Sequence, residues 1–131
     1  MPWPRVLRYL WASPPTLVGL TLAALAGRGG SIGLVDGVVE AHGPRLRWAL
    51  AHLPPLTGGA VAVTLGHVVL GRDARALEDT RAHERVHVRQ YERWGPFFIP
   101  VYLAASVWIA WRGGHPYFDN PFEREAWETT P

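Results

Sequence analysis

Two histidines and a glutamate lie close together in the second half of the chain, in the pentapeptide His83-Glu84-Arg85-Val86-His87. On a helix, side chains four residues apart share one face, so both imidazoles can reach a single ion. A catalytic Zn²⁺ site has about three protein ligands and one water, and a neighbouring carboxylate can serve as general base. The pattern therefore predicts a zinc site with His83 and His87 as ligands and Glu84 as the catalytic base. Without a third ligand, it would mean only two partly buried, hydrogen-bonded histidines.

The segment 120–127 is the candidate source of the third ligand. Asn120 suits an N-cap, Pro121 suits the first helical position, and acidic residues follow in the first turn. Glu123 would then lie one turn into a short C-terminal helix. A second helix of this kind can bring a carboxylate to the two histidines.

The histidine motif, followed some tens of residues later by Glu123-Arg124-Glu125-Ala126, resembles the gluzincin metallopeptidases. The similarity is to small bacterial, membrane-associated proteins that are distantly like the CAAX prenyl endopeptidases, and it covers about residues 60–127. It implies a minimal zincin-like fold with Glu123 as the third ligand and Glu125 as the fallback. In the family an aspartate that supports a ligand histidine usually follows the alanine, but Trp127 stands there. This departure leaves open what orients the histidines.

The expected function is that of a zinc-dependent hydrolase, specifically a metallopeptidase acting on a peptide or protein. Zinc would polarise the scissile carbonyl and acidify its water, and Glu84 would take the proton. The alternative is a non-catalytic, membrane-associated zinc-binding scaffold or interaction module. Three protein ligands and an open position would favour the enzyme, whereas four protein ligands would favour the scaffold.

Three further polar residues are candidates for a place near the metal. His115 and Tyr117 precede the expected third ligand and can donate to an oxyanion. His67 lies in the apolar run 60–70, which predicts either one strand with a bulge at Gly66 or a tight hairpin. In gluzincin-like folds the strand beside the metal pairs with an extended peptide, which would place His67 near the site. The alternative is that this strand is only sheet core.

The histidine helix also carries a stripe of arginines at every fourth position, namely Arg81, Arg85, Arg89 and Arg93. Arg85 is about 200° around the helix from His83, so the stripe should face away from the zinc. It is either a solvated face with Glu78 and Glu92 as partners, or a contact for anionic lipid headgroups.

After Gly95-Pro96, which should end the histidine helix, the run 97–111 is apolar and has 15 residues. As a helix it would reach roughly 22 Å, which is short of the roughly 30 Å hydrocarbon core of a bilayer. It is expected to be a buried helix, an interfacial helix or a tilted partial span. A full span would separate His87 from Glu123, so this segment should return the chain to the same side.

The N-terminal segment 1–30 is apolar in its centre and is treated apart from a single zincin-like domain at 31–131. Three interpretations are open: a cleaved signal peptide, a membrane-associated segment, or a helix of the domain that starts at about Thr16. We favour a retained segment that packs on the domain or dips into a membrane.

The 131 residues are enough for one domain with a modest core. We expect an α+β fold with a small antiparallel sheet, the histidine helix, an apolar helix and a short C-terminal helix. Segments 32–40 and 45–50 are read as strands, although 46–53 fits a helix equally well. No cysteine is present, so zinc must rest on histidine and carboxylate.

The chain carries a net charge of only +2, which gives no reason to expect nucleic acid as a partner. Its seven tryptophans either lie at a membrane interface or fill the core. We expect the protein on a membrane, at the cytoplasmic side, with the membrane surface as a second partner beside its substrate. The oligomeric state is not predicted.

Overall fold

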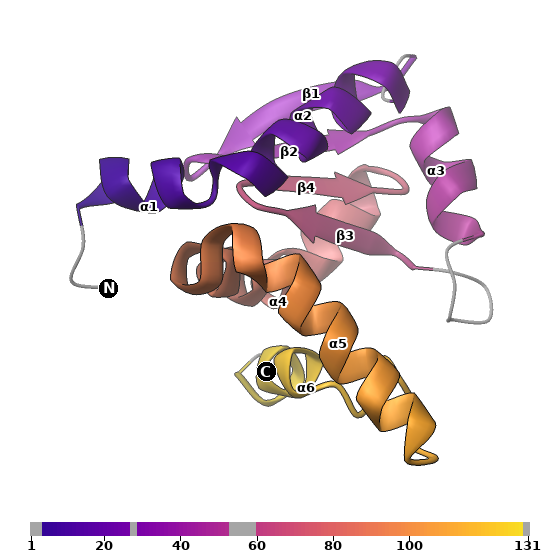
Figure 1. Ribbon diagram of the computed structural model, residues 1–131. Coiled ribbons are helices and arrows are strands. Elements are labelled where there is room, and N and C mark those ends of the chain that lie inside the picture. Colours follow the sequence, from indigo (N-terminus) through magenta and orange to yellow (C-terminus); the bar gives the residue numbers. More distant parts are fainter. Residues whose placement is uncertain (1–3, 27–28, 53–59, 130–131) are drawn as a thin grey trace.

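The computed structural model describes residues 4–26, 29–52 and 60–129, and its architecture is α+β, as expected (Figure 1). One four-stranded sheet has the strand order β1-β2-β4-β3. The strands are β1 (Ser31–Val35), β2 (Val38–His42), β3 (Ala62–Leu65) and β4 (Val68–Gly71). β3 is therefore an edge strand, and β4, which pairs with it, is the last strand before the histidine motif.

The prediction of a wholly antiparallel sheet is wrong at the centre, where β2 and β4 run parallel with Val39 opposite Val68. The reason is the connection through α3 (Pro44–Ala51) and β3, which carries the chain back to the end of the sheet where β2 began. Segment 45–50 is thus helical, with Leu46 and Leu50 buried one turn apart, and its reading as a strand is wrong. The two outer pairs of strands are antiparallel hairpins.

The run 60–70 forms a tight hairpin, which resolves the two alternatives for this segment. Gly66 has φ +62°, a conformation that favours glycine, and an added Cβ would lie 2.2 Å from Thr16 Oγ1. The same Thr16 hydroxyl accepts a hydrogen bond from the His67 backbone N–H at 3.0 Å. The turn is therefore held directly against the N-terminal helices.

Helices cover both faces of the sheet (Figure 1). On one face, Ala23 of α2 (Ser13–Ala26) packs with Val68 and Leu70 of β4. On the other face, Leu77 of α4 (Ala74–Trp94) packs with Val69, which alternates with those two residues along the strand. A strand buried on both faces is continuously apolar, as β4 is.

The described part of the N-terminal segment forms α1 (Arg5–Trp11) and α2, and residues 1–3 and 27–28 lie outside the description. The helix begins at Ser13 rather than at about Thr16, with Pro14 and Pro15 tolerated in its first turn. α2 packs tightly against the sheet at Gly19, where an added Cβ would lie 2.8 Å from the Val68 side chain. Its outer face exposes Leu17, Val18 and Leu25.

α4 ends at Trp94, where Gly95 has φ +57°, as the Gly95-Pro96 pair predicted. A 3₁₀ turn (Gly95–Phe97) leads into the apolar helix α5 (Phe98–Trp111), and α6 (Pro121–Thr129) follows. Figure 1 shows α5 and α6 lying beside the α4 layer, on the side of the molecule away from α1 and α2. The predicted return of the chain is confirmed, since α6 packs on α4.

The described tryptophans do not fill the core, because five of them are exposed: Trp48, Trp94, Trp108, Trp111 and Trp127. That alternative for the tryptophans is wrong at these positions, and Trp3 lies outside the described residues. The buried-helix alternative for 97–111 is wrong as well, since only Phe98 of α5 is buried.

Candidate metal centre

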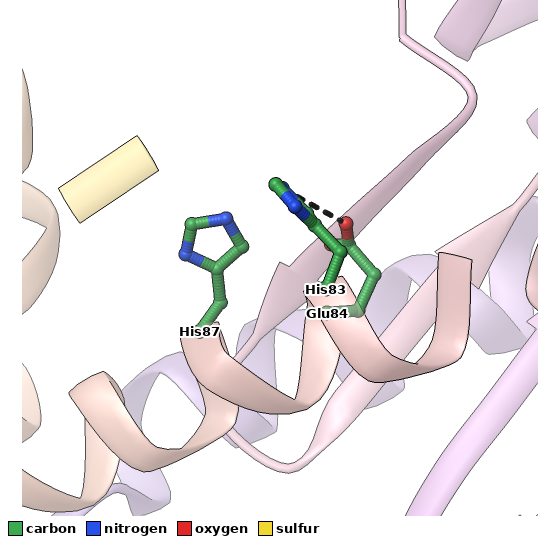
Figure 2. Close-up of side chains that lie close together, drawn as sticks. All are labelled: His83, Glu84 and His87. Atoms are coloured by element: carbon green, nitrogen blue, oxygen red, sulfur yellow. Dashed lines mark ion pairs between the residues drawn. The ribbon is translucent and has the colours of Figure 1, made fainter. Parts of the chain in front are cut away.

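His83 and His87 project from the same face of α4, and both side chains are buried. Asp73 caps this helix by accepting a hydrogen bond from the Ala76 N–H at 2.8 Å. The two imidazole centroids are 5.1 Å apart, and Figure 2 shows the rings rising side by side from the helix with the Glu84 carboxylate next to His83. The ligand atoms of these three residues all lie within 4.8 Å of one another. The helix therefore gathers the three residues of the motif at one point.

Glu123 is brought to the two histidines by α6. The helix begins as expected, since Asn120 Oδ1 accepts a hydrogen bond from the Phe122 N–H at 2.9 Å. Glu123 is buried, and its Oε1 lies 3.3 Å from His83 Nε2 and 3.0 Å from His87 Nε2. Three potential metal ligands from two helices thus point their donor atoms at one place.

The electrostatics of this cluster are those of a carboxylate held between imidazoles. Burial alone would raise the pKa of Glu123, but the hydrogen bonds of His83 and His87 lower it to about 2. Burial alone would lower the pKa of His87, but the hydrogen bond and charge of Glu123 raise it to about 9. The cluster therefore stabilises a negative carboxylate, which is the form that binds a cation.

The two separations between Glu123 Oε1 and the histidine Nε2 atoms suit a tetrahedral ion. With ligands at about 2.0–2.1 Å, neighbouring donors of a tetrahedron are about 3.3 Å apart. The two distances from Glu123 Oε1 to the histidine nitrogens are 3.3 and 3.0 Å. Imidazole nitrogens and a carboxylate oxygen are also the donor types that Zn²⁺ accepts in proteins without cysteine. The residues present therefore fit a zinc ion.

Glu84 is anchored by the edge strand. Its Oε1 accepts a hydrogen bond from Thr64 Oγ1 on β3 at 2.8 Å, and its Oε2 lies 3.9 Å from His83 Nε2. Burial raises the pKa of the Glu84 carboxyl, although the nearby His87 and the Thr64 hydroxyl act in the opposite direction. Glu84 thus has one oxygen fixed and the other turned toward the histidines.

The two histidines are oriented by different neighbours. His87 Nδ1 lies 2.8 Å from the Oε1 of Gln90, a buried residue one turn further along α4. His83 packs against Trp127, with ring centroids 4.5 Å apart, and its Nδ1 is buried without a hydrogen-bond partner among the described residues. Trp127, which stands where the family pattern has an aspartate, therefore supports His83 by packing.

Glu125, the fallback ligand, takes a different position from Glu123. Its side chain is 44% exposed, and its Oε1 accepts a hydrogen bond from Gln90 Nε2 at 2.6 Å. Glu125 thus contacts the residue that holds His87, whereas Glu123 contacts the two histidines themselves.

Two tyrosines lie at the Glu123 carboxylate. Tyr102 of α5 donates its hydroxyl to Glu123 Oε2 at 2.6 Å. Burial and the charge of Glu123 raise the pKa values of both Tyr102 and Tyr117, so both hydroxyls keep their protons. Tyr117 therefore lies near the site as expected, and both tyrosines are hydrogen-bond donors there.

His115 and His67 have roles in the fold. His115 Nδ1 accepts hydrogen bonds from the N–H groups of Tyr117 and Phe118 at 3.1 Å each, so it shapes the loop before α6. His67 Nε2 lies 2.8 Å from Glu92 Oε2, and its ring stacks on Tyr9 at 3.8 Å. These contacts join the β3–β4 turn and α1 to the C-terminal end of α4.

The arginine stripe is not a simple solvated face. Arg81 Nη2 and Arg85 Nη2 both lie 2.8 Å from the carboxylate of Glu40, a buried residue on β2. Arg85 also donates to the carbonyl of Val35 at 3.1 Å. Glu40, rather than the expected Glu78 or Glu92, is the hydrogen-bonded partner of these two arginines, whereas Arg89 and Arg93 are exposed. Arg81 and Arg85 therefore fix α4 on the sheet.

Three residues of the site, Gln90, Thr64 and Tyr102, were not predicted from the sequence. Gln90 stands three positions after His87, a spacing that places two helical side chains side by side. Thr64 and Tyr102 are hydroxyl-bearing residues within mainly apolar runs, which gives no local signal of a site. In comparisons with known proteins, no family model, no curated protein and no solved structure matches this chain.

Proposed function

We propose that this protein is a zinc-dependent hydrolase, specifically a metallopeptidase, with His83, His87 and Glu123 as zinc ligands and Glu84 as general base. The observation that carries the proposal is the position of Glu123 Oε1, which lies 3.0 and 3.3 Å from the two histidine Nε2 atoms. The two histidines of the His-Glu-x-x-His motif and a carboxylate from a separate helix together supply the three protein ligands of an open zinc site.

A bound Zn²⁺ supplies Lewis acidity, which polarises a carbonyl and makes water more acidic. Glu84 accepts the proton of the attacking water through Oε2, since Oε1 is held by Thr64. Burial raises the pKa of Glu84, and a raised pKa improves a carboxylate as a base near neutral pH. The same carboxyl group then gives the proton to the leaving amine, so Glu84 acts in both halves of the reaction.

An extended peptide is the substrate class that the neighbourhood of the site favours. Thr64 belongs to β3, the edge strand of the sheet, and its hydroxyl touches Glu84. A peptide that adds to the open side of an edge strand would run directly past the base. Tyr117 supplies a protonated hydroxyl near Glu123 that can donate to a developing oxyanion, whereas the Tyr102 proton is already donated to Glu123 Oε2.

A closed, non-catalytic zinc centre is the second candidate, and the depth of burial favours it. The side chains of His83, Glu84, His87 and Glu123 are each at most 11% exposed. The ligand atoms of His83, Glu84 and His87 also lie within 4.8 Å of one another, so Glu84 could serve as a fourth ligand. Four protein ligands leave no open position, and the protein would then be a scaffold.

The substitution Glu84→Gln separates these two candidates. Glutamine keeps an oxygen that can accept the Thr64 hydroxyl, but it cannot accept a proton from water. If Glu84 is a base, the variant keeps its zinc and hydrolysis of a peptide library falls by about 10²- to 10⁴-fold. If Glu84 is a ligand, the variant loses zinc affinity together with any activity. A wild type that holds zinc and cleaves no peptide would favour the scaffold.

We also propose that α5 attaches the protein to a membrane surface. Its outward face forms an apolar groove of Leu103, Ala104, Val107, Trp108 and Trp111, and Trp111 is 80% exposed. The guanidinium of Arg112 lies 5.3 Å from the Trp108 ring, an arrangement suited to the boundary between headgroups and hydrocarbon. Trp111 follows Tyr102 by nine residues, about 180° around the helix, so the groove faces away from the metal centre.

A flotation assay with anionic liposomes tests the membrane proposal. Val107→Asp should reduce co-flotation, because it places a charge in the groove. Leu34→Asp is a matched control, since Leu34 on β1 is 71% exposed and Val107 is 69% exposed. Equal losses from the two substitutions, or a wild type that stays entirely out of the liposome fraction, would contradict attachment through α5.

A further inference from the structure

The largest fully buried side chain among the described residues is that of Gln90, which lies beside the metal centre. It is 1% exposed. Its Nε2 donates to the Phe122 carbonyl at 2.9 Å and to Glu125 Oε1 at 2.6 Å, and both of these partners are on α6. Its Oε1 lies 2.8 Å from His87 Nδ1 on α4. One amide group thus joins the two helices that carry the candidate ligands.

The surroundings of Gln90 determine which way its amide points. The Phe122 carbonyl and the Glu125 carboxylate can only accept hydrogen bonds, so the NH₂ group must face α6. The reverse orientation would turn the amide oxygen toward two other oxygens and lose both hydrogen bonds. The amide oxygen must therefore face His87, and an oxygen that only accepts requires a proton on His87 Nδ1.

A fixed proton on Nδ1 decides which nitrogen of His87 is free for a metal. Nε2, which lies 3.0 Å from Glu123 Oε1, is then the nitrogen that can give up its proton and bind a metal through its lone pair. Metal-binding histidines commonly donate their other ring N–H to a neighbour that fixes the tautomer and the ring orientation. His83 differs, since its Nδ1 is buried without such a partner among the described residues.

We propose that Gln90 is a positioning residue that selects Nε2 of His87 as the metal-binding nitrogen and couples His87 to α6. The inference rests on the proposed metal site of His83, His87 and Glu123. Because one amide contacts both His87 and α6, the orientation of His87 and the docking of α6 depend on each other. His87 and Glu123 are therefore positioned together.

Two substitutions distinguish positioning from a general role in packing. Gln90→Leu removes the acceptor for His87 and both bonds to α6, and it should lower zinc affinity by about 10- to 100-fold. Gln90→Glu also loses both bonds to α6, but it keeps an oxygen that accepts from His87 Nδ1. It should therefore destabilise the metal-free protein as much as Gln90→Leu does, while its zinc affinity stays close to that of wild type. Equal losses of affinity in the two variants would overturn the positioning role.

The tautomer of His87 can be read without any metal. In the metal-free wild type the Glu123 carboxylate competes by accepting a hydrogen bond from Nε2, so the tautomer is read in the Glu123→Ala background, where that competitor is removed. Nitrogen-15 spectra of metal-free Glu123→Ala, recorded at a pH where the ring is neutral, should show the His87 proton on Nδ1, and adding Gln90→Leu should shift it toward Nε2. A proton on Nε2 in Glu123→Ala would overturn the inference. If Glu123→Ala shows the Nδ1 proton but wild type binds no zinc, the proposed function fails while the control of the His87 tautomer by Gln90 stands.

Discussion

Replacing Glu123 with alanine should remove most of the zinc affinity, whereas replacing Glu125 should not, although the two residues share one helix and lie two positions apart. Glu123 Oε1 is within 3.3 Å of both histidine Nε2 atoms. Glu125 Oε1 instead accepts a hydrogen bond from Gln90. The first substitution therefore removes a ligand, and the second removes only a partner of the residue that orients His87.

The expected magnitudes follow from these positions. Loss of a group that contacts a metal ligand typically lowers metal affinity by about 10- to 100-fold. Glu125 contacts Gln90 and not His87 itself, so Glu125→Ala should lower zinc affinity by about tenfold or less. Glu123→Ala should exceed the upper end of that range, a loss of at least about 2.8 kcal/mol in binding free energy. It also leaves the Tyr102 hydroxyl without the acceptor that it has at 2.6 Å.

Zinc affinity is measured for both variants by competition with a chromophoric chelator. Thermal unfolding of the metal-free proteins is the control, because Glu123→Ala must remain folded for its affinity to be meaningful. Equal affinities of the two variants, or a larger loss in Glu125→Ala, would refute the assignment of Glu123 as the third ligand.

Two predictions concern the fold. Burial alone would raise the pKa of Glu40, but hydrogen bonds and charge from Arg81 and Arg85 hold this pKa below its usual value of 4.5. The stability that the Glu40 carboxylate contributes is therefore present at neutral pH and is lost as the pH falls below about 4.5. Glu40→Gln should lower the free energy of unfolding by about 3 kcal/mol at neutral pH, and this free energy, measured by urea titration, should then fall less steeply at acid pH. The same pH dependence in the variant and in wild type would contradict this expectation. His67→Ala should lower the free energy of unfolding by about 3 kcal/mol, because Glu92 loses a buried partner, and should leave zinc affinity unchanged in the chelator assay. A stable His67→Ala variant with weaker zinc binding would contradict the structural role of His67.

The end of α4, the start of α6 and the position of Glu123 could be predicted from the sequence because local chemistry decides them. Asn120-Pro121 starts α6 and Gly95 ends α4, as their residue types indicate. The i, i+4 spacing of the histidines puts them on one face of α4 for the same reason. Glu123 lies in the first turn of the capped helix α6, so it reaches the histidines once the chain returns to α4.

The direction of the central strands could not be predicted, because it depends on a long connection rather than on local pattern. Segment 45–50 has the apolar content of a strand, but Pro44 starts a helix there, and that helix allows β2 and β4 to run parallel. The partner of the arginine stripe was missed for a similar reason. Glu40 is 41 positions before Arg81, and only the docking of α4 on the sheet brings the two together.

Metal content is the most direct test of the central claim that two histidines and Glu123 form a zinc site. The protein is purified without chelators, and its zinc content is measured by mass spectrometry alongside His87→Ala. We expect about one zinc per chain in wild type and little in His87→Ala, since structural and catalytic zinc sites hold their ion through such ligands. A wild type with far less than one zinc per chain, or a His87→Ala variant with the same content as wild type, would contradict the account.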